Sequence, residues 1–296
     1  MAVNKVEATI NGTKYTLSYN SSTGAYEADI TAPGKSSFNQ TGGFYNVIVT
    51  AYDDHGNSTI VDSASSSMGK LLKLYVKEKV KPTIQLTAPT ANAVLTNNKP
   101  TISWQCKDDD SGINAESIEL YIDENAVDGT INAIKSGTNY TCSYVPNVSL
   151  SDGNHTLKFS CEDNDGNSTE TSILIKIDTV PPTLNVSNPS KDINTNVTPI
   201  EIKGRTNDTT SSPVTVTVNG KNATVDSNGD FTANVDLSLG NNEITIIAKD
   251  GAGKTTTVVR NVNYNNIPPT ITNIQIVPNP VDAGKTFKIS VEVTDS

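Results

Sequence analysis

Short runs in which hydrophobic and polar residues alternate recur along the whole chain. In residues 101–106, Ile102, Trp104 and Cys106 alternate with polar side chains, and the run at 157–161 has the same pattern. A period of two places every second side chain on one face, which is typical of a β-strand with one buried face. Helical periodicity is almost absent, so the pattern predicts an all-β protein.

Turn signals separate these alternating runs. The dipeptides Asn11-Gly12, Asn219-Gly220 and Asn228-Gly229 each fall between two of them. Asn and Gly tolerate the positive φ that tight hairpin turns require. Thr is also abundant, and it favours the pleated, half-buried surface of a strand. The chain is therefore expected to consist of many short strands joined by tight turns.

Two motifs recur at a regular distance. A proline-threonine opening occurs at 80–84, 180–184 and 267–271. An Asp-x-x-Gly turn between two alternating runs begins at Asp53, Asp163 and Asp250. The period of roughly 85–100 residues is too long for a solenoid repeat and fits a series of β-sandwich domains. The opening suits a linker that feeds a first strand, and the turn suits the hairpin between strands F and G.

With these two motifs the chain resembles bacterial immunoglobulin-like (Big-type) repeat domains. Such domains occur in tailed-phage virion and tail-associated proteins and in Gram-positive surface adhesins. The resemblance covers essentially the whole chain and implies a tandem array of immunoglobulin-like Greek-key β-sandwiches. The motifs are moderately specific for the fold and carry little information about function.

The repeat divides the chain into four parts of unequal completeness. The start of the chain matches part of the third repeat in order and spacing: residues 6–13 correspond to 214–221, and residues 21–30 correspond to 226–235. Because 214–221 follows the first two strands of its domain, the first repeat is expected to lack strands A and B. The predicted parts are 1–79, an Ig-like domain without strands A and B; 80–178 and 179–264, two complete Ig-like domains; and 265–296, a partial domain with strands A and B only.

The incomplete parts allow three interpretations. In the first, the first domain is a variant sandwich and the chain is a fragment of a longer protein. In the second, a neighbouring protein completes the open parts. In the third, the last strands of one copy complete the first domain of the next copy. An unpaired strand edge with an apolar face is a template for strand addition. A head-to-tail contact that does not close builds a filament.

Two of the three cysteines occupy positions that the resemblance makes informative. Cys106 falls on the predicted strand B and Cys161 on the predicted strand F, and both face inward by parity. The resemblance to Ig domains implies a possible disulfide between them. The alternative is a pair of buried thiols that pack as small hydrophobic groups. Cys142 is left without an obvious partner.

Carboxylates follow both of these strands. Because the loops after strands B and F lie at the same end of a sandwich, their oxygen atoms are expected to converge, and Ca²⁺ prefers such ligands. The spacing is not that of an EF-hand loop. The candidate calcium ligands are Asp108, Asp109, Asp110, Asp163 and Asp165.

A simpler interpretation competes with the calcium site. Lys77, Lys79 and Lys81 of the preceding linker can neutralise the same carboxylates, with solvent providing the rest. The two histidines, His55 and His155, fall at predicted turns and are expected to be solvated.

Charge and composition restrict the function further. The net charge of −10 argues against nucleic acid or an anionic membrane as a partner, because phosphates are bound by clustered Lys and Arg. No run of about 18 apolar residues is present, and the first residues lack the apolar segment of a secretory signal. No nucleophile, base and acid stand at a recognisable spacing. We therefore expect no enzymatic activity and no cofactor apart from the calcium candidate.

These observations favour a structural or interaction protein. The resemblance and the lack of a visible signal predict a phage or phage-derived tail particle, in which the chain decorates the tail or baseplate and contacts other tail proteins, a second copy, or a host-surface glycan. The expected location is the virion, assembled in the bacterial cytoplasm. The alternatives are a stalk or adhesin segment of a Gram-positive cell-surface protein and a carbohydrate-binding array of a wall hydrolase.

Overall fold

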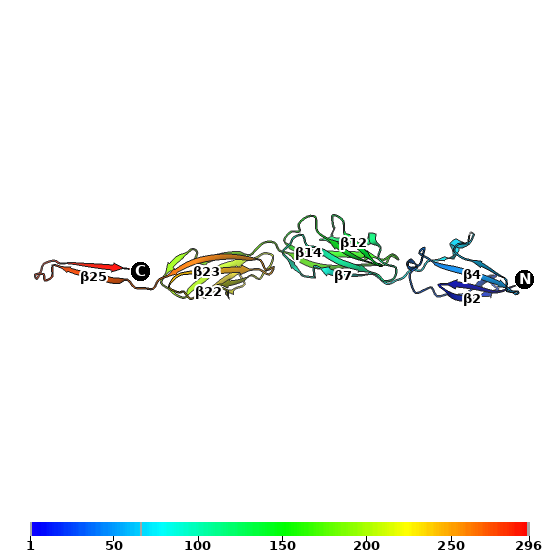
Figure 1. The fold of residues 1–296 in the computed structure, drawn as a ribbon, viewed down its shortest axis with the longest axis horizontal. Coiled ribbons are helices and arrows are strands. Elements are labelled where there is room, and N and C mark those ends of the chain that lie inside the picture. Colours follow the sequence, from blue (N-terminus) through cyan, green and yellow to red (C-terminus); the bar gives the residue numbers. More distant parts are fainter. Residues whose placement is uncertain (1, 66, 295–296) are drawn as a thin grey trace. The chain divides into compact units, whose positions relative to one another are not determined.

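The computed structural model of the chain describes residues 2–65 and 67–294. Met1, in the predicted first domain, Ser66 and residues 295–296, in the predicted last part, lie outside the described residues. The chain forms two compact units, residues 1–177 and 178–296, and the strands of each can be followed in Figure 1. The described elements are strands and three short 3₁₀ helices, which confirms the all-β prediction. None of these helices is long and apolar enough to cross a membrane.

The first domain is built on one antiparallel sheet. Its strands follow the order β3-β2-β1-β4-β5, and β6 pairs with β4. A small buried cluster of Ile10, Tyr45 and Val76 forms its core. The elements are β1 (Val3–Ile10), β2 (Thr13–Asn20), β3 (Ala25–Glu27), η1 (Ser37–Asn39), β4 (Tyr45–Asp53), β5 (Ser58–Val61), η2 (Gly69–Leu72) and β6 (Lys73–Leu74).

The second domain is a two-sheet sandwich. One sheet has the order β12-β13-β9-β7 and the other β11-β10-β14-β15-β8, which places them as D-E-B-A and C′-C-F-G-A′ of an Ig-like fold. The elements are β7 (Thr83–Ala88), β8 (Val94–Leu95), β9 (Ile102–Lys107), η3 (Ala115–Ser117), β10 (Glu119–Ile122), β11 (Asn125–Ala126), β12 (Asn132–Ser136), β13 (Asn139–Tyr144), β14 (Gly153–Glu162) and β15 (Ser168–Ile177).

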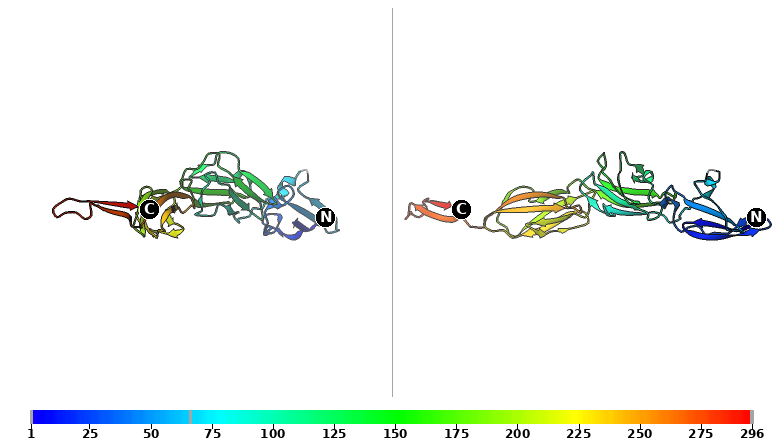
Figure 2. Two further views of the ribbon diagram at one scale, coloured as in Figure 1. Left: turned by 60° about the vertical axis from the view of Figure 1, so that its left-hand side comes forward. Right: turned by 45° about the vertical axis from the view of Figure 1, so that its right-hand side comes forward.

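The third domain repeats this topology strand for strand. Its sheets have the orders β16-β18-β22-β21 and β17-β24-β23-β19-β20, and Figure 2 shows the domain from two further sides. The elements are β16 (Thr183–Asn188), β17 (Ile193–Thr195), β18 (Ile200–Asn207), β19 (Thr215–Val218), β20 (Lys221–Asn222), β21 (Thr224–Val225), β22 (Asp230–Val235), β23 (Gly240–Lys249) and β24 (Thr255–Tyr264).

Alternation along the strands builds both cores. In β9 every second residue is buried, and β14 behaves in the same way from His155 onward. Trp104 of one sheet packs edge-on against Phe159 of the other, with their ring centroids 5.1 Å apart. In the third domain Phe231 is buried among aliphatic side chains. The tandem Ig-like sandwich predicted from the sequence is therefore present in two complete copies.

Two of the three predicted hairpin turns adopt the tightest hairpin geometry. Asn11 and Gly12 have φ of 49° and 78°, and Asn219 and Gly220 have φ of 49° and 76°. Positive φ at both central residues is the requirement of a type I′ turn. At Asn228-Gly229 only the glycine has positive φ, because the Asp226 carboxylate organises a longer turn by accepting from the N–H groups of Asn228 and Asp230.

The core-facing side chains of the first domain are poorly covered compared with their equivalents in the third. Ile244 and Ile246 on β23 are fully buried. Val47 and Val49, at the matching positions of β4, are only half-buried. In the third domain the A-B-E sheet covers this face. The described part of the first domain has no strand A or B to do so.

The E-like strand of the first domain also pairs differently from its equivalent in the third. In the third domain β22 pairs with β18, the B strand. The matching segment of the first domain, β3, pairs instead with β2, at the edge of the one sheet that the described residues of this domain form. A strand needs a hydrogen-bonding neighbour, and β3, which has no described strand B beside it, finds that neighbour in β2.

The last described strands form a two-stranded hairpin of β25 (Thr270–Val277) and β26 (Lys288–Thr294). They follow the third proline-threonine opening, as strands A and B do in the two complete domains. Their register places six large aliphatic side chains on one face, each 43–59% exposed. These residues, which we call the hairpin face, are Ile271, Ile274, Ile276, Ile289, Val291 and Val293.

Candidate functional site

A cluster of three carboxylates lies at the end of the second domain where the chain enters it. Glu78 precedes β7, Asp108 directly follows β9, and Asp163 directly follows β14. One oxygen from each lies within 4.8 Å of the other two. Asp108 and Asp163 are buried and Glu78 is half-buried. We call this set the first carboxylate cluster.

The third domain carries an equivalent cluster. Asp178 precedes β16, Asp208 directly follows β18, and Asp250 directly follows β23. Their oxygens also lie within 4.8 Å of one another, and all three residues are buried. This second carboxylate cluster arises from the same three strand ends as the first, so the fold itself brings these positions together.

Local hydrogen bonds hold the carboxylate that follows each B strand. One oxygen of Asp108 accepts from the N–H groups of Asp110 and Gly112, at 3.0 and 2.8 Å. One oxygen of Asp208 accepts from the N–H groups of Thr210 and Ser211, at 2.8 and 2.6 Å. Both side chains therefore organise their own loop through Oδ1.

Several polar atoms at the clusters are buried without a hydrogen-bond partner. These include Oδ2 of Asp178, Oδ2 of Asp250 and the hydroxyl oxygens of Ser111 and Ser211. The two serines lie at equivalent positions of the two B–C loops. A buried polar atom without a partner is rare and costly in a folded protein. The repetition in two domains indicates a shared cause.

No described Lys, Arg or His forms an ion pair with the six cluster carboxylates. Lys77 Nζ instead donates to the backbone carbonyl of Asp165, at 3.3 Å. Burial raises the pKa of Glu78 above its ordinary value. The hydrogen bond that the Ser111 N–H donates to Glu78, at 3.1 Å, opposes this shift, and the charges of Asp108 and Asp110 add to it.

The structure brings together only part of the predicted calcium set. Asp108 and Asp163 join the first cluster, whereas Asp109 is exposed. Asp110 turns toward the first domain and accepts from the N–H of Ser36 at 3.0 Å. Asp165 accepts from the N–H of Glu78 at 3.0 Å. These two carboxylates therefore anchor neighbouring backbone.

Sequence reasoning missed four cluster members. Glu78 and Asp178 stand shortly before the proline-threonine openings, and Asp208 and Asp250 repeat Asp108 and Asp163 in the third domain. The signal was available in the repeat itself, because the pairs 78/178 and 108/208 are each 100 positions apart.

The three cysteines lie together in the core of the second domain as free, buried thiols. The possible Cys106–Cys161 disulfide is not formed in the structure. Cys106 donates to Cys142 on the neighbouring strand, which raises the pKa of Cys106 to about 12. The Cys161 thiol donates a hydrogen bond to Cys106, and this bond together with burial raises the pKa of Cys161. The hydrogen bond that Cys142 accepts from Cys106 lowers the pKa of Cys142. Cys142, which had no predicted partner, therefore links to the other two.

One histidine differs from its prediction. His55 is exposed, as expected of a turn residue. The prediction that His155 is solvated is wrong, because it lies in β14 and is buried. Its Nδ1 is 2.7 Å from Asp123 Oδ2 and its Nε2 is 2.8 Å from the carbonyl oxygen of Ser151. The side chain thus ties two loops together.

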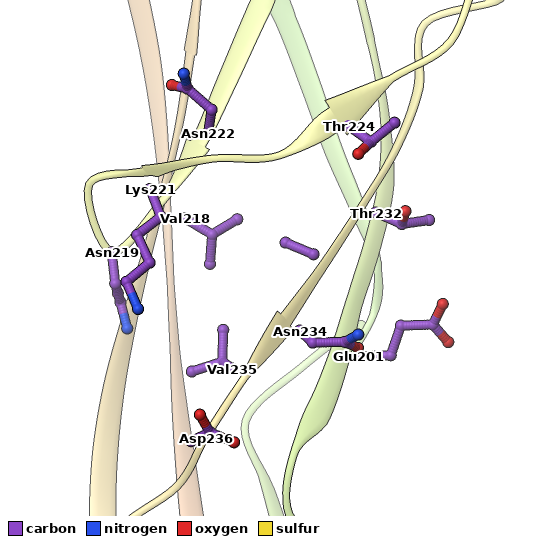
Figure 3. Close-up of a pocket in the computed structure, with 11 residues that line it drawn as sticks. Glu201, Val218, Asn219, Lys221, Asn222, Thr224, Thr232, Asn234, Val235 and Asp236 are labelled. Atoms are coloured by element: carbon purple, nitrogen blue, oxygen red, sulfur yellow. The ribbon is translucent and has the colours of Figure 1, made fainter.

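A polar hollow of about 450 Å³ lies in the third domain, at the side of the sandwich where β20 and β22 face each other. Figure 3 shows Asn219 and Lys221 across the hollow from Thr232 and Glu201. Its lining consists of amide, hydroxyl, charged and small aliphatic side chains and includes no aromatic ring. It offers hydrogen bonds but no stacking surface.

The fold defines the class of this protein as a tandem array of immunoglobulin-like domains. Comparison with family models then places the two complete sandwiches: residues 82–158 match the bacterial Ig domain, and residues 182–266 match domain B of glucodextranase. The chain contains bacterial Ig-like repeat domains, as its motifs predicted.

One curated relative is Bacillopeptidase F of Bacillus subtilis (strain 168), which is 27% identical over 210 residues. The match covers 70% of this chain and 14% of that protein. The chain therefore spans a small part of the relative's length.

Solved structures of tandem Ig-like and fibronectin-type modules are also similar. The fibronectin(III)-like modules of Clostridium thermocellum CbhA are 17% identical, with a TM-score of 0.38, over 62% of this chain and 94% of theirs. Titin domains I67–I69, in an E-to-A variant, are 12% identical, with a TM-score of 0.43, over 88% of each chain. Sidekick-1 immunoglobulin domains 1–5 are 11% identical, with a TM-score of 0.40, over 99% of this chain and 60% of theirs.

Proposed function

We propose that this chain is a non-enzymatic structural array that spaces or joins other parts of a larger assembly. The observation that supports this role most directly is that the segment entering each complete sandwich is built into it. The Thr169 hydroxyl donates to the carbonyl of Pro82 at 2.7 Å, and Thr256 donates to the carbonyl of Pro182 in the same way. Both threonines lie near the start of a G strand, so the segment that enters each sandwich is bonded to the same place in its domain.

The entry of the second domain has further anchors. The Glu78 N–H donates to Asp165, and Asn167 Nδ2 donates to the Glu78 carbonyl at 3.3 Å. A linker whose backbone is bonded into a folded domain loses the freedom of a random coil. A spacer benefits from such restriction.

Within this role we propose a phage or phage-derived tail particle as the location, on the resemblance of the repeat motifs. Particles purified through a density gradient are expected to contain the chain in a constant ratio to the tail proteins. The measurement is quantitative immunoblotting of particles, culture supernatant and washed cell walls. Recovery from cell walls alone, with none in particles, contradicts this location.

A second candidate is a non-catalytic segment of a longer bacterial surface or secreted protein, such as a stalk, an adhesin or a wall hydrolase. The similarity to a part of Bacillopeptidase F and to domain B of glucodextranase supports it. The same fractionation separates the candidates, because this one requires the chain in walls or supernatant. Binding to a glycan array, through surfaces such as the polar hollow of the third domain, tests the carbohydrate-binding form.

We also propose that a second copy of the chain is a partner. The hairpin face presents A-type and B-type strands whose aliphatic side chains are exposed, while the first domain has core positions that an A–B pair covers in the third domain. The two surfaces are thus complementary in strand type and in polarity. Strand addition of this kind satisfies both the backbone edge and the apolar face.

A further inference from the structure

We propose that each of the two carboxylate clusters binds one Ca²⁺ ion. The first site consists of Glu78, Asp108 and Asp163, and the second of Asp178, Asp208 and Asp250. A spacer role does not require metal, so this inference is independent of the proposed function.

The spacing of the oxygens suits a calcium ion. Ca²⁺ takes oxygen ligands at about 2.3–2.6 Å, so two ligands of one ion stand at most about 5 Å apart. In each cluster one oxygen per residue lies within 4.8 Å of the others. Neither cluster includes a Cys or His, which zinc and copper sites favour. The donor set selects a hard cation.

The second cluster lacks the neutralising partners that buried carboxylates need. Asp178 is 0% exposed and Asp250 is 5% exposed. Each has one oxygen bonded to a backbone N–H, from Val180 and Lys254, while its other oxygen has no partner. Buried charges are tolerated when they are paired or coordinate a metal. A cation between the three carboxylates accounts for both orphaned oxygens.

The orphaned hydroxyls support the same assignment. Ser111 and Ser211 are both buried beside the clusters, and neither Oγ has a hydrogen-bond partner. The first cluster therefore shares the unsatisfied hydroxyl of the second. Hydroxyl and carboxylate oxygens together can complete the six to eight ligands that Ca²⁺ takes.

The first domain provides an internal contrast. It also has neighbouring acids at its F–G turn, Asp53 and Asp54 beside His55. There the carboxylates are not buried, and both oxygens of Asp53 are used by the N–H groups and side chain of its own turn. Asp163 of the first cluster uses both of its oxygens in the same way, so the contrast is with Asp250 of the second cluster, whose Oδ2 has no partner.

Calorimetric titration of the full chain tests the proposal. After treatment with chelator and removal of the chelator, CaCl₂ is added and the stoichiometry is measured, with MgCl₂ as comparator. We expect two ions per chain with dissociation constants of about 10⁻⁴–10⁻³ M, the range of extracellular modules. The melting temperature of each unit is expected to rise on addition of Ca²⁺.

Two substitutions remove one site each. Glu78→Gln and Asp178→Asn keep an acceptor oxygen for the local backbone N–H but remove the charge. Each is expected to reduce the stoichiometry from two to one and to abolish the calcium-induced rise in melting temperature of its own unit. Because each substitution relieves repulsion between carboxylates, the metal-free melting temperature is expected to stay equal or to increase, which separates lost binding from lost folding.

Matched controls use exposed aspartates of the same domains. Asp109→Asn, next to Asp108, and Asp236→Asn are expected to keep both sites. The absence of heat and of any thermal shift at 10-fold above the expected dissociation constants overturns the proposal. It is equally overturned if Glu78→Gln and Asp178→Asn both still bind two ions, whatever their metal-free melting temperatures.

Discussion

At the scale of single residues, burial decides what each cysteine can do. The three thiols of the second domain are buried and contact one another. The hydrogen bond from Cys106 to Cys142 raises the pKa of Cys106 to about 12. A thiolate is the reactive form of cysteine. Burial therefore opposes reaction of all three thiols with external reagents, and the raised pKa opposes it further at Cys106 and Cys161.

We predict that a disulfide exchange reagent modifies none of the three thiols at a measurable rate in the native chain. Reaction requires opening of the core, which slows it by about 10³-fold or more relative to the unfolded chain. Ser172→Cys, on the exposed face of β15, is the positive control and is expected to react at once. Rapid modification of a native thiol contradicts the buried cluster.

The cost of losing a side chain also depends on its burial. Leu157 on β14 is fully buried, whereas Leu174 on the neighbouring strand β15 is 43% exposed. We predict that Leu157→Ala lowers the free energy of unfolding by about 2–5 kcal/mol. Leu174→Ala, the same chemical change on the surface, is expected to stay within about 0.5 kcal/mol.

Denaturant titration followed by tryptophan fluorescence measures both changes. Trp104 is the single tryptophan of the chain and lies fully buried in the core of the second domain. Its signal therefore reports the unfolding of this domain. Equal costs for the two leucines contradict the assignment of strand faces.

At the scale of secondary-structure elements, single carboxylates fasten short strands. Asp192 precedes β17, which pairs in parallel with β24. Its oxygens accept from the N–H of Asn261 at 2.8 Å and from Asn261 Nδ2 at 3.2 Å. These two bonds lower the pKa of Asp192 from its ordinary value of 3.8. The ionised carboxylate thus holds the A′ strand against strand G.

The sign of the pH effect follows from this shift. Because the pKa is lower in the folded chain, the stabilisation is present above pH 3.8 and is lost as the pH falls through the folded pKa. We predict that hydrogen-exchange protection of the β17 amides decreases over that range. Asp192→Ala is expected to lower the protection already at neutral pH, and the exposed Asp236→Ala is not. Unchanged protection in Asp192→Ala contradicts this role.

Pairing choices are also made at this scale. The segment that forms the E strand in the third domain forms β3 in the first, and there it pairs with the C′ strand. The local sequences are alike, with Phe231 and Tyr26 at matching positions. The available neighbour, and not the strand's own residues, therefore selects the sheet that it joins.

At the scale of the whole molecule, the proposed contact between copies makes a prediction. The full chain is expected to form larger species as its concentration rises, measured by size-exclusion chromatography with light scattering. Val291→Lys places a charge on the hairpin face and is expected to leave a monomer. Glu292→Lys changes the opposite face of the same strand and is expected to assemble like the original chain.

Two outcomes contradict this contact. One is a monodisperse monomer of the original chain at every concentration tested. The other is assembly that Val291→Lys and Glu292→Lys affect equally, since the two residues point to opposite faces of β26. A charge buried in an apolar interface is costly, so the two variants must differ if the hairpin face is the surface that joins copies.

Much of the architecture was predictable from local patterns. Period-two alternation marked the core strands, Asn-Gly pairs marked two type I′ turns, and the repeated motifs indicated tandem Ig-like sandwiches. These features depend on residues close together in the sequence. Backbone conformation and strand parity are local properties, so a single chain reveals them.

Only the tertiary structure decided which distant groups meet. Asp109 and Asp110 neighbour Asp108 in sequence, yet the partners of Asp108 are Glu78 and Asp163, which arrive from a linker and another sheet. His155 proved buried because two loops close over it, and Cys142 proved to contact Cys106 because their strands pair. Such encounters depend on how the sheets pack. Each strand by itself specifies which side chains face inward, and only the folded sandwich determines what they face.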